Sequence, residues 1–500
     1  MLEINHLTIS VDNKIMIDNL RLVLNEHDKL AIIGEEGNGK STLLKVILQD
    51  CPYASYQGDI NTHKAKIGYL KQTLTKEELS LSVHDYLFPE LEFYFNKCKE
   101  FYILLEQFQL SDEIEEQTLK TLSGGEKVKV QLLKIMLEEA DILLLDEPTN
   151  DLDLNTLQWL EHFINQCEKG IIFVSHDETL LSHCANQILH LELRKKKTEP
   201  IYTWKKIDYD AYVEKRLSHL QKLTQVAHSE KREHKKKMDR LMRQMQQVDH
   251  QLNTISRQDP RGAALLKKKM KNVKSLEKRI TNEEVSEVPD VEESINLFFP
   301  ECSLPSRKEV LNLTLTTLQI KNKILAKNIK LEIFGPKHLV IIGKNGIGKT
   351  TLMNHIWELL KERQDIRPAY MKQNYEEHFN EKETPLDFLC PNHERDLVSK
   401  TRQYLGNLNF TRKEMTSPIS ELSGGSKAKL ILLSLMMKNC NVLLLDEPTR
   451  NVSPLSNPII RRALRDFQGC IISISHDRKY IEEVCDSVYE LKTEGIVKVR

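Results

Sequence analysis

Two glycine-rich segments of the chain have the composition of loops that hold phosphate groups. The first reads Gly34-Glu-Glu-Gly-Asn-Gly-Lys40-Ser41, and the second reads Gly343-Lys-Asn-Gly-Ile-Gly-Lys349-Thr350. In such loops the glycines let backbone N–H groups close on phosphate oxygens, the lysine neutralises the outer phosphates, and the final hydroxyl reaches a Mg²⁺ ion. Each half of the chain is therefore predicted to bind a nucleoside triphosphate. The residues predicted to hold it are Gly34, Glu35, Glu36, Gly37, Asn38, Gly39, Lys40, Ser41 and Thr42 in the first half, and Gly343, Lys344, Asn345, Gly346, Ile347, Gly348, Lys349, Thr350 and Thr351 in the second.

The flanking sequence predicts the elements that position these loops. Each loop follows a short apolar run, at residues 29–33 or 339–342, and precedes a segment with helical spacing. A buried strand that ends at a glycine-rich turn and leads into a helix is the context in which such a loop functions. Glu35 and Glu36 are unusual neighbours for a triphosphate, so we expect their side chains to point outward and to weaken affinity at the first loop.

Three further patterns occur once in each half. They are a Leu-Ser-Gly-Gly signature, an Asp-Glu pair directly after an apolar run, and a Ser-His-Asp triplet. Each pattern lies 300 residues from its counterpart, whereas the loop lysines Lys40 and Lys349 lie 309 residues apart. The two halves are therefore expected to share one fold, and the first half is longer by nine residues between its loop and its signature.

Loop, signature, carboxylate pair and histidine together resemble the ATP-binding cassette superfamily, with both cassettes in one chain. In that family the cassettes pack head to tail, so that the signature of one closes over the ATP held by the other. Each signature serine begins a helix whose unpaired N–H groups would face a γ-phosphate. The signature residues that the resemblance implies for ATP binding are Ser123, Gly124 and Gly125 in the first half, and Ser423, Gly424 and Gly425 in the second.

The same resemblance implies roles for the remaining motif residues. Catalytic carboxylates that polarise the attacking water, and histidines that brace the γ-phosphate, are expected at Glu147, Glu447, His176 and His476. Residues that position Mg²⁺, including two glutamines that couple the metal to the helical subdomain, are expected at Ser41, Gln72, Asp146, Thr350, Gln373 and Asp446. The second half departs from the pattern after its carboxylate pair, because Arg450-Asn-Val-Ser-Pro454 stands where the first half has acidic residues. Unequal hydrolysis at the two sites is expected, with some turnover at each.

The segment between the halves resembles neither of them. From Lys215 to Arg279 there are about 19 Lys or Arg residues against about 6 Asp or Glu residues, while the whole chain has a net charge of -1. Pro260 and Gly262 interrupt the segment, which predicts two antiparallel helices with a tip near residues 256–262, the first about 45 residues and roughly 65 Å long. The residues predicted to form the apolar seam between them are Met238, Leu241, Met242, Met245, Val248, Leu252, Ile255, Leu266, Met270, Val273, Leu276 and Ile280.

This basic hairpin suits a nucleic-acid backbone better than the alternative of a plain spacer, which needs no excess of one charge. Aromatic residues are almost absent from its tip, which argues against stacking on single strands and favours insertion into folded nucleic acid. The predicted RNA-binding residues are Lys235, Lys236, Arg240, Arg243, Arg257, Arg261, Lys267, Lys268 and Lys269.

Composition places the chain among soluble proteins of two or three domains, with 40% hydrophobic and 29% charged residues in a length of 500. There is no apolar run near 18 residues, and no signal-peptide pattern is seen, so we expect a cytoplasmic protein without a membrane domain. Nine scattered cysteines indicate reduced thiols and argue against a zinc site. The expected domains are a first cassette at 1–204, a helical hairpin linker at 205–290 and a second cassette at 291–500. The fold class is therefore α/β, with two P-loop ATP-binding cassette domains joined by a long basic antiparallel α-helical hairpin.

Two cassettes, no membrane domain and an intervening basic hairpin resemble the ABC-F translation factors. The resemblance implies a monomer whose cassettes form an internal pseudo-dimer and whose partners are the 70S ribosome, rRNA and the P-site tRNA. It also implies that ATP-gated closure inserts the linker near the peptidyl transferase centre. The compact form is similar to the antibiotic-resistance subgroup that protects ribosomes from drugs. A housekeeping ABC-F translation factor, a DNA-repair ATPase and a transporter ATPase subunit are the alternatives.

Overall fold

The computed structural model describes residues 1–500 except 151, 255–259, 283–298, 300–302, 321–322 and 381. The chain divides into two compact units. One unit comprises Met1–Asp210 together with Val291–Arg500, and the other is Ala211–Asp290. The two halves that carry the motifs therefore belong to the same unit.

A six-stranded sheet forms the centre of the first half, in the order β5-β6-β7-β3-β8-β9. Five of its strands are parallel, and β9 joins β8 in the antiparallel direction. Continuous apolar runs form the central strands because helices cover a parallel sheet on both faces. The strands are β3 (Lys29–Ile33), β5 (Ile67–Leu70), β6 (Ile142–Asp146), β7 (Gly170–Val174), β8 (Gln187–Leu193) and β9 (Glu199–Lys205). A separate antiparallel sheet contains β1 (Leu2–Val11), β2 (Lys14–Leu24) and β4 (Ala54–Asn61).

The second half repeats this topology strand for strand, in the order β13-β14-β15-β12-β16-β17. Its strands are β12 (His338–Ile342), β13 (Pro368–Met371), β14 (Val442–Asp446), β15 (Cys470–Ile474), β16 (Ser487–Lys492) and β17 (Gly495–Lys498), beside the hairpin β10 (Glu309–Ile320) and β11 (Lys323–Phe334). Both the α/β class and the shared fold of the two halves, predicted from the repeated motifs, are confirmed.

Helices connect the strands and cover the sheets in both halves. In the first half, α1 packs Leu43 and Leu44 into a core that also contains residues of β1, β3 and β6. The helices of this half are α1 (Lys40–Ile47), α2 (Lys76–Ser80), α3 (Val83–Leu87), α4 (Leu91–Gln107), α5 (Gly124–Leu137), α6 (Leu154–Gln166), α7 (Glu178–Cys184) and α8 (Arg194–Lys197). Those of the second half are α11 (Lys349–Leu360), α12 (Pro385–Leu389), α13 (Arg395–Asn407), α14 (Gly424–Met437), α15 (Asn457–Arg465) and α16 (Arg478–Val484).

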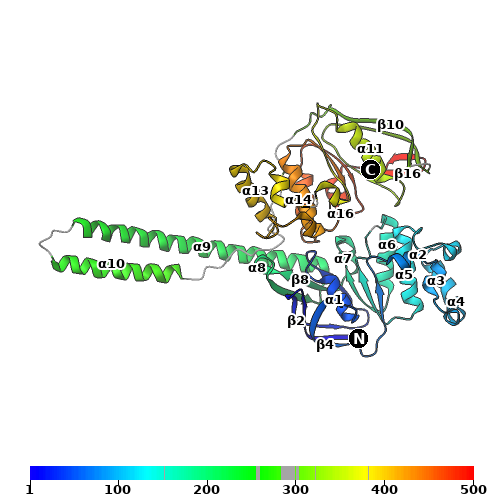
Figure 1. Ribbon diagram of the computed structural model, residues 1–500, viewed down its shortest axis with the longest axis horizontal. Helices are drawn as coiled ribbons and strands as arrows, with labels where there is room; N and C mark the ends of the chain where they lie inside the picture. Colours follow the sequence, from blue (N-terminus) through cyan, green and yellow to red (C-terminus); the bar gives the residue numbers. More distant parts are fainter. Residues whose placement is uncertain (151, 255–259, 283–298, 300–302, 321–322, 381) are drawn as a thin grey trace. The chain divides into compact units, whose positions relative to one another are not determined.

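The other unit is an antiparallel helical hairpin, with α9 and α10 side by side in Figure 1. Helix α9 (Tyr209–Thr254) has 46 residues and α10 (Pro260–Thr281) has 22, so the predicted length of the first helix is confirmed. Leu241, Val273 and Ile280 form its buried seam, with Met238 and Met245 packed against them. In the described part of the chain, no helix is both long and apolar enough to cross a membrane.

Two of the predicted seam positions are wrong. Met242 is 52% exposed and Leu276 is 43% exposed. Met242 follows Leu241 directly, and consecutive residues of a helix point about 100° apart, so only one of the two can face the partner helix. Leu276 lies on the edge of the stripe that Val273 and Ile280 define.

The described side chains of the predicted RNA-binding residues are all exposed. Ile255 and Arg257, predicted for the seam and for RNA contact respectively, lie outside the described residues.

Candidate functional site

Each phosphate loop lies between a central strand and a helix, β3 and α1 in the first half and β12 and α11 in the second. The loop glycines have backbone angles that side chains rarely allow. Gly39 and Gly348, directly before the helices, have φ values of 87° and 103°. A Cβ atom on Gly34 would stand 2.3 Å from the Leu191 carbonyl oxygen. Glycine at these positions is therefore needed for the loop to fold, and the folded loop presents the start of a helix to an anion.

The loop lysines hold their ammonium groups inside the loops. Lys40 Nζ donates to the carbonyl oxygens of Gly34 and Glu35, at 2.8 and 3.0 Å. Lys349 Nζ donates to the Gly343 carbonyl oxygen at 2.7 Å, and burial lowers the pKa of this lysine although three carboxylates oppose the shift. A buried ammonium group at the centre of a glycine-rich loop gains from a bound anion, so the loops fit a polyphosphate.

A hydroxyl and a carboxylate meet beside each lysine. Ser41 Oγ donates to Asp146 Oδ1 at 2.9 Å, and the Tyr69 hydroxyl donates to Asp146 Oδ2 at 3.2 Å. In the second half, burial raises the pKa of Asp446 although a hydrogen bond from Thr350 opposes the shift. Asp446 Oδ2 is buried and has no hydrogen-bond partner among the described residues. An unpaired carboxylate oxygen next to a hydroxyl is a donor set that fits Mg²⁺.

The two predicted glutamines lie in different surroundings. Gln373 lines a cavity together with Asp446 and Glu447. Gln72 follows β5 and is exposed, and no described contact joins it to Asp146.

The predicted catalytic glutamates share a strained backbone. Glu147 and Glu447 have φ values of 50° and 54°, in the left-handed region that glycine favours. Such strain persists only where the surrounding structure imposes it, and it is concentrated at functional sites. His176 Nε2 lies 3.0 Å from Glu147 Oε1, whereas His476 Nε2 lies 3.9 Å from Glu447 Oε1. Both halves therefore bring the predicted carboxylate and histidine together, but the pair is tighter in the first half.

The two glutamates differ in their protonation. Burial opposes the charge of Glu147, but His176 and Lys40 outweigh burial and hold its pKa below the ordinary value of 4.5. In Glu447, burial and the neighbouring Asp446 raise the pKa to about 8. Burial and Lys349 lower the pKa of His476 to about 4, so this histidine gives Glu447 no positive partner at neutral pH.

This difference predicts that Glu147→Gln and Glu447→Gln change the unfolding temperature in opposite directions, in protein without nucleotide or Mg²⁺. The raised pKa of Glu447 means that its contribution to stability is complete below about pH 4.5 and is lost as the pH rises through about 8. At pH 8 the Glu447→Gln variant should therefore unfold at a higher temperature than wild type, by roughly 3–6 °C. Glu147→Gln removes a carboxylate with a lowered pKa and should unfold at a lower temperature. Thermal unfolding at pH 5 and pH 8 measures both, and shifts of the same sign would contradict the assignment.

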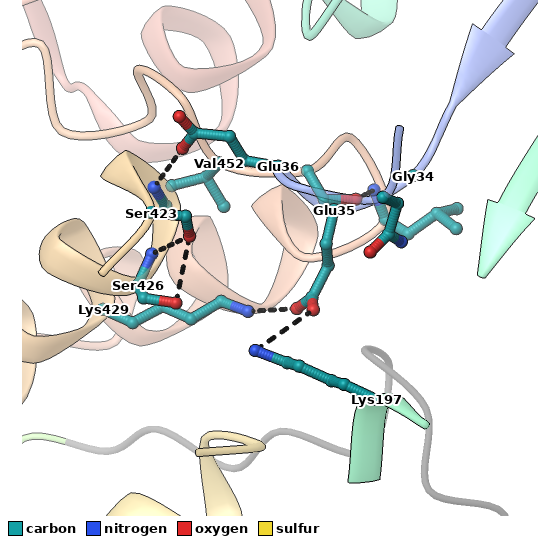
Figure 2. Close-up of polar contacts among 12 residues, drawn as sticks. Gly34, Glu35, Glu36, Lys197, Ser423, Ser426, Lys429 and Val452 are labelled. Atoms are coloured by element: carbon teal, nitrogen blue, oxygen red, sulfur yellow. Dashed lines mark hydrogen bonds and ion pairs between the residues drawn. The ribbon is translucent and has the colours of Figure 1, made fainter. Parts of the chain in front are cut away.

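The first loop lies against the signature helix of the other half, as Figure 2 shows. The Glu36 carboxylate accepts a hydrogen bond of 2.8 Å from the Gly425 N–H, in the first turn of α14. Beside it, Lys429 Nζ donates to the Glu35 carboxylate at 2.6 Å. Glu35 therefore does not point outward as expected, whereas Glu36 is exposed but bonds to the other half. Both carboxylates are drawn to α14, whose N-terminal amides and Lys429 present positive charge.

The two signature helices differ in how their first turns are satisfied. Glu126 caps the first signature, because its carboxylate accepts from the Ser123 backbone N–H at 2.8 Å. Ser426 occupies the matching position of the second signature and bonds to the Ser423 hydroxyl. In α14 the acidic partner comes from the other half, because the Gly425 N–H donates to the Glu36 carboxylate.

At the second site, both halves line one cavity of about 450 Å³. Lys349, Thr350 and His476 line it from the second half, whereas Gly124 and His176 line it from the first. His176 Nδ1 also lies 2.8 Å from the Val452 carbonyl oxygen of the second half. The head-to-tail pairing that the family resemblance implied is the arrangement seen at both sites.

Sequence reasoning missed several residues that line this cavity. Ile320 and Leu325 belong to the hairpin β10–β11, and Thr149 and Leu152 follow the carboxylate pair of the first half. The hairpin residues carry no motif and could not be recognised by type. The pair from the first half could have been found, because they adjoin a motif whose family packs across the cassette boundary.

Comparison with known proteins gives one matching family and a set of distant relatives. A family model described as ABC transporter matches residues 17–150 and 326–450. The ATP-binding protein YdiF of Bacillus subtilis is 28% identical over 99% of this chain and 80% of its own length. ABC transporter F family member 5 of Arabidopsis thaliana is also 28% identical, over 78% of this chain and 54% of its own length.

Among solved structures, the archaeal ribosome recycling factor aABCE1, in complex with a ribosomal stalk protein, aligns over 99% of this chain and 90% of its own. The TM-score is 0.59 at 15% identity, which shows a shared fold.

Proposed function

Because this chain belongs to the ABC transporter family, whose model matches both of its halves, we propose that it is an ABC-F protein in which ATP-driven closure of two cassettes moves a basic hairpin into ribosomal RNA. Each cassette binds ATP, and the protein is an ATP hydrolase. In this proposal residues 1–204 and 291–500 are the cassettes and 205–290 are the linker. The working form is a cytoplasmic monomer with an internal pair of cassettes.

In the proposed reaction the motif residues act in pairs, one set for each ATP. Bound ATP with Mg²⁺ supplies the reactive phosphate and the charge that neutralises it. The loop lysines hold the outer phosphate oxygens, and the signature amides of the opposite half close over them. Asp146 and Asp446, with the hydroxyls of Ser41 and Thr350, position the metal. Glu147 and Glu447 orient the attacking water.

The exposed cations of α9 and α10 are the observation that carries the nucleic-acid part of the proposal. Lys235, Lys236, Arg240, Lys267 and Lys268 all face solvent on a hairpin whose seam is apolar. Closely spaced lysines on a narrow rod neutralise phosphates and release counterions when the rod enters a groove. A relative named for the F family and a ribosome recycling factor of the same fold favour the ribosome as the source of that RNA. The proposed partners are therefore the 70S ribosome, its rRNA and the P-site tRNA.

Sedimentation through a sucrose gradient tests this proposal. The doubly substituted Glu147→Gln, Glu447→Gln chain should migrate with ribosomes in the presence of ATP, because closure without hydrolysis keeps the cassettes shut. The same chain with ADP is the control and should stay at the top of the gradient. Migration with membranes would instead favour a transporter subunit, and migration with DNA after nuclease controls would favour a repair ATPase.

Protection of the ribosome from antibiotics is the finer form of the proposal, with a housekeeping translation factor as the alternative. Expression in a drug-sensitive host separates the two. Increased resistance that is lost on substitution of Arg257 and Arg261 by alanine would support protection through the tip of the hairpin. If the protein leaves the drug concentration that stops growth unchanged, the housekeeping role is favoured.

A further inference from the structure

Two arginines of the second cassette meet two glutamates of the first in one patch between the cassettes. Both terminal guanidinium nitrogens of Arg461 on α15 contact the carboxylate of Glu178 on α7, one of them at 3.2 Å. These two side chains are 3% and 5% exposed. Arg478, the first residue of α16, contacts the carboxylate of Glu161 on α6 and lies 3.4 Å from Asp177 Oδ2. Buried ion pairs of this kind are costly to break on one side, because the remaining charge has neither water nor a partner.

The four residues are counterparts of one another in the repeated fold. Glu161 and Arg461 lie 300 residues apart on matching helices, and so do Glu178 and Arg478. Each position that is acidic in the first cassette is therefore an arginine in the second. We refer to Glu161, Glu178, Arg461 and Arg478 as the pairing patch.

Two neighbouring positions also differ in charge between the cassettes. Lys479 Nζ lies 3.5 Å from Glu178 Oε2, and its counterpart in the first cassette is the neutral Thr179. Arg461 Nε donates to Glu483 at 2.9 Å within the second cassette. The counterpart of this contact is His183 Nδ1, 3.2 Å from Glu161 Oε2 within the first cassette.

Pairing of like cassettes in this geometry would bury like charges. Two first cassettes would bring Glu178 of one against Glu161 of the other, and two second cassettes would bring Arg478 against Arg461. We propose that the pairing patch selects the partner: a first cassette accepts only a second cassette, of its own chain or of another copy. The patch thereby excludes like-with-like association of this chain with itself, and the proposal does not depend on the ribosome.

Correct pairing also matters for the nucleotide sites. Glu178 is adjacent in sequence to Asp177, which lines the cavity of the second site. His176, one residue further back, reaches the Val452 carbonyl oxygen of the other cassette. Loss of the pairing patch should therefore separate the two cassettes at the nucleotide sites that they form together. The rate of ATP hydrolysis should then fall.

Exchange of counterpart residues in the full-length chain tests the proposal. The acidic-to-basic half exchange introduces Glu161→Arg, Glu178→Arg, Thr179→Lys and His183→Glu. The basic-to-acidic half exchange introduces Arg461→Glu, Arg478→Glu, Lys479→Thr and Glu483→His. Each half exchange alone should lower ATP hydrolysis at least 10-fold. The full exchange, with all eight substitutions, restores opposite charges with the roles reversed and should recover the rate to within 3-fold of wild type.

Mixing the two half-exchanged chains provides a second readout. Each chain then carries two cassettes of one charge type, so only a complex of the two chains can pair correctly. Hydrolysis should recover on equimolar mixing and should not recover when either chain is concentrated alone. The matched control is Asn165→Arg with Arg465→Asn, an exposed counterpart pair on the same helices α6 and α15, and it should leave the rate unchanged.

The comparison decides the proposal even if the half exchanges do not fold. A soluble and active full exchange beside insoluble half exchanges supports selection by charge. A full exchange as impaired as the half exchanges overturns it, and so do half exchanges that hydrolyse ATP at the wild-type rate.

Discussion

Replacing Glu147 and Glu447 together with glutamine is expected to lower the rate of ATP hydrolysis by at least about 100-fold, since a positioned base contributes a factor of this order or more. Glutamine keeps the size of the side chain and can still bond to His176, but it cannot accept a proton from water. The ATP-binding residues are untouched, so the variant should retain ATP. Phosphate release and the amount of nucleotide retained after rapid desalting measure the two effects.

The single substitutions should not be equivalent. Glu147 has a lowered pKa and a close histidine, whereas Glu447 has a pKa near 8 and a more distant one. The larger share of hydrolysis at neutral pH should therefore be lost with Glu147→Gln. Glu377→Gln, an exposed glutamate of the second cassette, is the control and should hydrolyse ATP normally. A double variant that keeps more than a tenth of the wild-type rate would remove these glutamates from the reaction.

Substituting five exposed lysines of the hairpin with glutamine is expected to weaken binding to ribosomes by about 100-fold or more at low salt. The five are Lys235, Lys236, Lys267, Lys268 and Lys269. Each phosphate contact that is lost should also reduce the slope of log affinity against log salt by about one. Titration at several salt concentrations measures both quantities. ATP hydrolysis without ribosomes should not change, because these residues lie outside the cassettes.

An equal number of exposed lysines in the second cassette provides the control for that experiment. Substitution of Lys323, Lys327, Lys330, Lys492 and Lys498 removes the same charge from β10–β11 and the C-terminal strands. Affinity for ribosomes should then change by no more than about threefold, as for a general change of net charge. Equal losses in the two variants would show that overall charge, and not the hairpin, controls binding. Circular dichroism should confirm that α9 and α10 persist, since their apolar seam is unchanged.

The sequence predicted those parts of the structure that local signals determine. Repeated motifs at a constant spacing were enough for the shared topology of the halves, and apolar residues at helical spacing on both sides of Pro260 and Gly262 were enough for the hairpin. The seam was predicted less well, because apolar character alone does not distinguish Leu241 from the adjacent Met242. The angular position of each residue around the helix axis decides which of them is buried.

Contacts between distant segments could not be predicted in this way. Glu36 and Gly425 are far apart in sequence, and nothing near Glu36 indicates that an amide of α14 faces it. Arg461 and Glu178 show the same limit, although their exchanged charges are visible once the halves are aligned at 300 residues. The missing information is the packing of one cassette on the other, which depends on surfaces and not on motifs.

The acidic pair beside Lys40, Glu35 and Glu36, competes with a bound triphosphate for the signature helix of the other half. A triphosphate that is to contact the Gly425 amide must displace the Glu36 carboxylate, which accepts a hydrogen bond from that amide. The second loop has Lys344 and Asn345 at the matching positions, so a triphosphate can bind there without displacing an acidic side chain of the loop. ATP should therefore bind in two stages. The second site should fill at a lower ATP concentration than the first, where Glu36 still occupies the Gly425 amide.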